Sequence, residues 1–154
     1  MRSRIRLLLV FPALSFAACG GGAGTFTPGL GEIMTMQQMR HAKLWFAGRA
    51  ANWELAAYET DELEEGFADA MHFHATHKSS PVPLTQAIPT YVDAPVRELR
   101  ASIDGKDAGR FEHAFDALTA GCNGCHLATQ FGFNVVVRPA ANTFANQDFA
   151  VPGR

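Results

Sequence analysis

The stretch Cys122-Asn123-Gly124-Cys125-His126 sets two cysteines three positions apart, with a histidine directly after the second. On a helix, this spacing places the two thiols one turn apart on the same side. Thiols so placed can add to the two vinyl groups of one porphyrin, and the histidine that follows can coordinate the iron. Cys-x-x-Cys-His is the attachment pattern of a c-type haem. The stretch therefore predicts one covalent haem c, held by Cys122 and Cys125 as thioethers, with His126 as the proximal iron ligand.

Two other uses of a cysteine pair fit this sequence less well. A thioredoxin-type pair lies at the start of a helix within a βαβ pattern. Here apolar residues recur at helical spacing before the pair, from Phe111 to Leu118, so the pair lies near the end of a helix. A zinc or copper site is the other alternative, but zinc takes four ligands, and the stretch supplies only three.

The beginning of the chain has the pattern of an export signal. Residues 1–18 start with a basic segment, continue as an apolar run and end in small residues, as secretory signal peptides do. The four residues from Phe16 to Cys19 resemble a bacterial lipobox, in which the cysteine is lipidated after cleavage. We expect a lipoprotein anchored to a membrane through Cys19 and facing the periplasm, with a soluble periplasmic protein as the alternative. Residues 19–30, which are rich in glycine, would form a flexible tether.

Charge narrows the range of partners. Loss of residues 1–18 removes three arginines, which leaves ten basic against fifteen acidic residues and a formal net charge of −5. Nucleic-acid binding requires a basic patch, so we exclude this class of partner. An acidic domain can be steered by charge toward a redox partner with a basic surface. The sequence contains no Ser-His-Asp pattern and no phosphate-binding loop, and we expect no enzymatic activity.

Apolar residues recur at helical spacing in four segments between the tether and the tail. Pro89 makes the stretch before residue 94 irregular, with at most a short helix around 84–90, whereas Pro95 falls in a first turn, where proline is tolerated. The sequence predicts an all-α fold, a four-helix up-down-up-down bundle over residues 31–131 with the haem motif on its last helix. Residues 132–154 are expected to form a tail packed on the bundle. The four helices are expected at residues 31–48, 52–76, 94–104 and 108–130.

This order of helices, with Cys122, Cys125 and His126 on the last of the four, resembles the cytochrome c-prime group, the class II c-type cytochromes that form four-helix bundles. The resemblance covers about residues 31–130 and implies an electron-transfer protein that can form a homodimer through its first helix. The chain departs from the group at Gln130, where a basic residue is usual one turn after the proximal histidine. It also departs in the 28 residues that follow His126.

The function depends on the face of the iron opposite His126. A strong sixth ligand makes an electron carrier, whereas an open face makes a protein that binds NO or CO. In an up-down-up-down bundle the last helix ends where the first begins, so a ligand from the first helix should lie in its first turns. Met34 is the first candidate, and Met36 and His41 are the alternatives. The resemblance agrees, because Met-ligated relatives supply their ligand early in the first helix; a methionine can equally be core filler.

Three further sets of residues receive weaker assignments. Aromatic side chains are expected to form the apolar wall of the haem pocket, and basic side chains are candidates for pairing with the haem propionates. Three histidines near the end of the second helix are most simply explained by the favourable helix dipole there. These sets are Trp45, Phe115 and Phe131 for the wall, Arg40, Lys43 and Arg138 for the propionates, and His72, His74 and His77 for the helix end.

Overall fold

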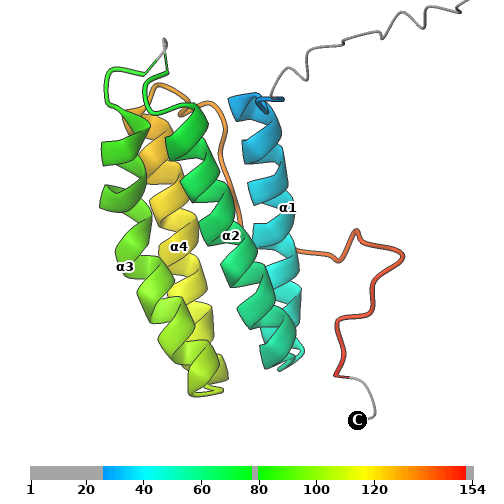
Figure 1. The fold of residues 1–154 in the computed structure, drawn as a ribbon. Helices are drawn as coiled ribbons and strands as arrows, with labels where there is room; N and C mark the ends of the chain where they lie inside the picture. The colour runs from blue at the N-terminus through cyan, green and yellow to red at the C-terminus, as the bar shows by residue number, and fades with distance from the viewer. Residues whose placement is uncertain (1–25, 78–79, 152–154) are drawn as a thin grey trace, which may run out of the picture.

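The computed structural model describes residues 26–77 and 80–151 of the chain. The predicted signal segment and Cys19 lie outside the described residues. Within them the fold contains four α-helices and no strand, which confirms the all-α four-helix bundle (Figure 1). The helices are α1 (Leu30–Arg49), α2 (Trp53–Phe73), α3 (Leu84–Asp104) and α4 (Ala108–Ala128).

Hydrogen bonds between side chains and backbone N–H groups begin three of the helices. The side chain of Asn52 accepts a hydrogen bond from the backbone N–H of Leu55 at the start of α2, and Asp107 does the same for Arg110 at the start of α4. At the start of α1, the backbone N–H of Gly29 donates to the Glu32 carboxylate. Each of these bonds gives a partner to a backbone N–H at the helix start that would otherwise lack one.

The helices associate as two closely packed pairs, α1 with α2 and α3 with α4, while α1 and α4 touch over only a small part of their lengths. Links of three residues join the members of each pair. The core between the pairs is fully buried and mostly aliphatic and aromatic, including Leu44, Leu63, Leu99, Phe111 and Phe115. The looser contact between α1 and α4 leaves space at one end of the bundle.

Helix α3 is longer than the sequence predicted. It runs without a break from Leu84 to Asp104, with Pro89 and Pro95 inside it. A proline inside a helix costs about 3 kcal/mol. Burial of a continuous apolar face offsets this cost, because each fully buried aliphatic side chain contributes about 1.5–3 kcal/mol. That face spans both prolines and consists of Leu84, Ala87, Ile88, Val92, Val96, Leu99 and Ile103.

Two glycines allow α3 and α4 to approach closely. A Cβ on Gly121 would lie 2.3 Å from the carbonyl oxygen of Tyr91, and a Cβ on Gly124 would lie 2.7 Å from the Tyr91 ring. Pro95 has no N–H to donate to that carbonyl four residues earlier. The Tyr91 carbonyl oxygen therefore accepts no i to i−4 hydrogen bond within α3. Because Gly121 has no side chain, α4 leaves room for this oxygen.

The tail after α4 packs on the bundle in part. It runs back beside the helices and then turns away next to α1 (Figure 1). Phe149 is buried, and its carbonyl oxygen accepts a hydrogen bond from the Asn52 side chain. Val135 and Val137, by contrast, are 65% and 68% exposed. The tail is thus held at separate points.

Candidate haem site

One end of the bundle contains a cavity of about 300 Å³, lined mostly by apolar side chains. Its volume is at the lower end of the range for pockets that hold small organic ligands. All four helices and the tail contribute to the wall, so residues far apart in the sequence meet there. Representative wall residues are Met34 of α1, Phe67 of α2, Ile88 of α3, Cys125 of α4 and Val136 of the tail.

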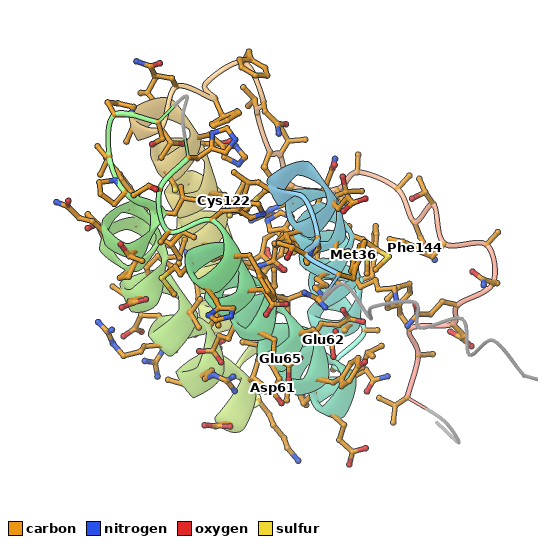
Figure 2. All side chains as sticks on the ribbon, turned by 45° about the horizontal axis from the view of Figure 1, so that its top comes forward. Met36, Asp61, Glu62, Glu65, Cys122 and Phe144 are labelled. Carbon is orange, nitrogen blue, oxygen red and sulfur yellow. The ribbon has the colours of Figure 1, made fainter. Side chains whose placement is uncertain are left out.

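Cys122 and Cys125 lie in the last two turns of α4, and both line the cavity. Figure 2 labels Cys122 on this helix. Both are free thiols. Burial raises the pKa of the Cys122 thiol to about 12, with a smaller contribution from the neighbouring Cys125, and burial also raises the pKa of Cys125. Cysteines that exchange disulfides have lowered pKa values and often lie at helix N-termini. Cys122 and Cys125 instead have raised pKa values and lie near the C-terminal end of their helix.

His126 also lines the cavity, and its ring is held by the tail. Its Nδ1 lies 2.6 Å from the carbonyl oxygen of Asn134. Because a carbonyl can only accept, Nδ1 carries the hydrogen, and Nε2 of the neutral ring keeps its lone pair. Histidines that bind metals commonly donate their other N–H in this way, which fixes the ring and makes it a stronger donor. The geometry therefore leaves Nε2 of His126 available to a metal.

Asn123, the first residue between the two cysteines, connects α4 to the same part of the tail. Its side-chain amide donates to the carbonyl oxygen of Val136 and accepts from the Val136 N–H, both at 2.8 Å. Sequence reasoning missed this contact. The only signal was an amide side chain within the motif, and nothing in the sequence indicates which backbone group it would meet.

Of the three candidates for a sixth ligand, Met34 and His41 line the cavity, whereas Met36 does not. Met36 is 44% exposed and lies on the side of α1 away from Cys122 (Figure 2). Met34 and His41 are two turns apart, about 10 Å along the helix. At most one of them can lie next to a given metal ion.

His41 is buried, and its imidazole is neutral near pH 7. Its Nε2 lies 2.8 Å from the hydroxyl oxygen of Thr119, which donates its own hydrogen to the Phe115 carbonyl at 2.9 Å. Nε2–H of His41 is therefore the donor, and Nδ1 has no hydrogen-bond partner among the described residues. Burial lowers the pKa of His41 from 6.5 to about 4.

The predicted aromatic wall is only partly present at the cavity. Phe131 lines it, but Trp45 and Phe115 do not. They lie deeper in the core instead, where the Phe115 ring packs against the His41 ring at 4.4 Å between centroids and Trp45 packs against Phe115 at 4.9 Å. Phe115 therefore packs directly on His41, and Trp45 lies behind Phe115. Aliphatic residues such as Leu63 and Val92 take the expected place in the wall.

The basic side chains expected near the propionates have acidic partners elsewhere, and none of them lines the cavity. The pair of Arg138 lies at the surface, where such pairs contribute only about 0–1 kcal/mol, whereas Glu59, the partner of Lys43, is buried. The pairs are Arg40 with Glu62 at 2.8 Å, Lys43 with Glu59 at 3.7 Å, and Arg138 with Asp116 at 2.5 Å.

The three histidines at the end of α2 and just after it have separate surroundings, with His72 in the last turn of the helix. His74 donates from Nε2 to the carbonyl oxygen of Pro28 at 2.8 Å, which ties the segment before α1 to the end of α2. His77 lines the cavity beside Phe131, and His72 packs edge-on against Phe73. Within residues 26–77 and 80–151, no group of three or more His, Cys, Asp or Glu side chains is placed to hold a metal ion.

The side chains at the cavity fit a covalently attached haem. Two neighbouring thiols, Cys122 and Cys125, share one apolar wall, and His126 offers a nitrogen with a free lone pair. A haem iron needs only one or two protein ligands, because the porphyrin supplies the others. Among the described residues, no helix has the length and apolar character needed to span a bilayer. No family model, curated protein or solved structure matches this chain.

Proposed function

We propose that this protein is an exported monohaem c-type cytochrome that transfers single electrons. One observation carries the proposal: Cys122, Cys125 and His126 meet at a single apolar cavity to which α1 also contributes two side chains able to bind iron, Met34 and His41. The expected up-down-up-down topology agrees with this cavity. The starts of α1 and α3 and the end of α4 line it, and α2 contributes Leu63 and Phe67 from its middle and later part.

Haem c, when bound, supplies an iron that cycles between ferric and ferrous states by one electron. Cys122 and Cys125 would hold it by thioether bonds, and Nε2 of His126 would be the proximal ligand. The aliphatic wall would keep water away from the iron, and burial of the metal in such a wall is one way in which a protein sets the reduction potential. The Asn134 carbonyl would keep the proton of His126 on Nδ1.

Met34 remains our first candidate for the sixth ligand, with His41 as the alternative. A protein that binds NO or CO at an open iron face is the second candidate function. The observation that favours it concerns His41, which is already engaged by the Thr119 hydroxyl and packed on the Phe115 ring. If Met34 acts only as core filler, and these contacts hold the His41 ring away from the iron, the sixth position stays open.

We further propose that the domain is anchored through Cys19 to a membrane and faces the periplasm. Leu30, where α1 begins, lies at the cavity, so a tether would leave the bundle at the haem end.

The partner would be a redox protein with a basic surface. Asp61, Glu62 and Glu65 lie on α2 (Figure 2). Asp61 and Glu62 are paired with arginines, and Glu65 forms no ion pair within the described part of the chain.

The test is expression with a c-haem maturation system, followed by mass analysis of the denatured protein. We expect a mass increase of one haem that is lost in the Cys122→Ala/Cys125→Ala double variant. Visible spectra with and without CO then separate the two functions. A low-spin spectrum that CO does not change supports electron transfer, whereas a high-spin ferrous form that binds CO supports gas binding. An unmodified mass would overturn both.

The sixth ligand is tested with two methionines that differ in position. Met34→Ala should open the sixth site, giving a high-spin spectrum and CO binding. Met36→Ala is the matched control, because Met36 is exposed and should leave the spectrum unchanged. If Met34→Ala stays low-spin and His41→Ala becomes high-spin, His41 is the ligand instead.

A further inference from the structure

We propose that tail residues 134–138, here called the strap, position the ring of His126, and that Asn123 is the residue that fastens the strap to α4. The inference rests on the proposed function, in which His126 binds the haem iron. It assigns a role to a part of the chain that lies beyond the bundle and beyond the attachment motif.

Three polar contacts fasten the strap along α4. The carbonyl oxygen of Asn134 accepts from His126, the backbone of Val136 pairs with the Asn123 amide, and the Arg138 guanidinium binds Asp116. As the strap advances, its partners on α4 move back from residue 126 to 123 to 116. The strap therefore runs in the opposite direction to α4 and lies against it.

The two lengths agree with this arrangement. Four residue steps of extended chain cover about 13 Å, and the ten helical positions from His126 back to Asp116 cover about 15 Å. Arg138 also places its guanidinium carbon 4.3 Å from the centre of the Trp45 ring, so the far end of the strap reaches α1. The contacts can all form at once without a kink in α4.

The strap is held mainly by polar groups, with Val136 the half-buried one of its three valines. The side chains of Val135 and Val137 are mostly exposed, so they contribute little hydrophobic stabilisation. An asparagine amide offers one donor and one acceptor side by side, which matches the N–H and C=O of a single residue. Alanine offers neither group, and aspartate offers only the acceptor. Asn123 is therefore the specific fastening, placed three residues before His126.

The consequence for His126 is chemical as well as geometric. A hydrogen bond from Nδ1 to a carbonyl keeps the ring in one tautomer and orientation and makes Nε2 a stronger electron donor. A stronger donor stabilises ferric relative to ferrous iron and lowers the reduction potential. Release of the strap should therefore raise the potential. The strap makes Asn123 a positioning residue, since it acts on the iron only through His126.

The experiment compares the haem-loaded parent with Asn123→Ala and with a matched control, Asn142→Ala. Asn142 is an exposed tail residue, and among the described residues its side chain accepts one hydrogen bond, from the nearby Phe144 backbone N–H. We measure the mass of bound haem, the midpoint potential and the hydrogen exchange of the Val136 amide. Asn123→Ala should keep its haem, exchange Val136 faster and shift the ferric to ferrous ratio by about tenfold, a rise of about 59 mV for one electron. Asn142→Ala should change none of these.

Two results would overturn the proposal. Unchanged exchange of Val136 in Asn123→Ala would mean that the fastening does not exist in solution. Faster exchange at an unchanged potential would mean that the strap has only a structural role. If Asn123→Ala does not fold, Asn123→Asp serves instead, because it keeps the acceptor for the Val136 N–H.

A failure of the proposed function looks different. If the parent carries no haem, nitrogen NMR of His126 in the haem-free chain still tests the strap. The hydrogen should reside on Nδ1 in the parent and distribute over both nitrogens in Asn123→Ala. Equal tautomer populations in the two proteins would exclude the strap.

Discussion

His41 is a buried imidazole whose protonation opposes folding. Burial lowers its pKa from 6.5 to about 4, so between these pH values the unfolded chain binds more protons than the folded chain. The free energy of unfolding should therefore fall as the pH drops from 6.5 to 4 and become level below that. The contribution of this one group is on the order of 3 kcal/mol, at 1.36 kcal/mol per pKa unit. Urea unfolding of the haem-free chain between pH 7 and pH 4 measures it.

The control for this prediction is another histidine. In His41→Gln, acid should lower the free energy of unfolding much less than it does in the parent. In His113→Gln, acid should lower it as much as in the parent, because His113 is exposed on α4. The comparison must be a difference between variants, since other groups also titrate. Glu59, for example, has a pKa raised by burial and contributes with the opposite sign. Equal pH dependence of the parent and His41→Gln would refute the prediction.

At the scale of single residues, sequence reasoning was most successful where chemistry fixes local spacing. Cys122, Cys125 and His126 lie within five positions on one helix, so any helix brings them together. Counting turns placed Met34 and Met36 at the haem end, and of these two only Met34 lines the cavity; His41, two turns after Met34, lines it as well. The deeper location of Trp45 and Phe115 could not be deduced, because it depends on how far α1 and α4 separate. The Asn123 contact depends on the path of a tail without periodicity.

At the scale of elements, α3 shows how a strong local signal can mislead. Two prolines suggested a break, and each one does remove a backbone hydrogen bond. The apolar positions at residues 84, 88, 92, 96, 99 and 103 nevertheless keep one helical face through both prolines. Summed over the helix, this burial exceeds the local cost of the prolines. Periodicity over the whole segment was the more reliable guide, and it was present in the sequence.

The contact between α3 and α4 gives a prediction at the same scale. Gly121→Ala would put a Cβ 2.3 Å from the Tyr91 carbonyl oxygen, which is backbone and cannot rotate away. The two helices must then separate, and overpacking of this kind costs about 1–3 kcal/mol. Thermal unfolding followed by circular dichroism should show a lower midpoint for Gly121→Ala than for the parent.

Gly109 supplies the matched control on the same helix. The nearest atom to a Cβ at Gly109 would be a carboxylate oxygen of Asp107 at 3.6 Å, an ordinary contact. Alanine is the better helix former, so Gly109→Ala should be neutral or gain up to about 1 kcal/mol. If both variants have the same unfolding midpoint, the close approach of Tyr91 to Gly121 is not a constraint in solution.

At the scale of the whole molecule, the four helices enclose a largely apolar cavity at one end of the bundle. The four helices were predictable from periodicity, and their lengths came within a few residues except in α3. The cavity itself was not predictable in shape, since it arises where α1 and α4 fail to pack together at one end. A chain that keeps a largely apolar space of about 300 Å³ gives up stability in its ligand-free form.

This cost predicts how strongly the haem-loaded protein should differ from the haem-free chain. Cavities in protein cores destabilise by about 24 cal/mol per Å³, so an empty cavity of 300 Å³ represents up to about 7 kcal/mol. Because the cavity opens to solvent at the bundle end, the realised difference should be smaller but still several kcal/mol. Calorimetry of the matured protein and of the Cys122→Ala/Cys125→Ala variant should show a clearly higher Tm for the former. Gly109→Ala, expressed and loaded with haem in parallel, controls for the effects of preparing a variant protein. A haem-loaded protein that unfolds at the same temperature as the double variant would mean that the haem lies outside the cavity.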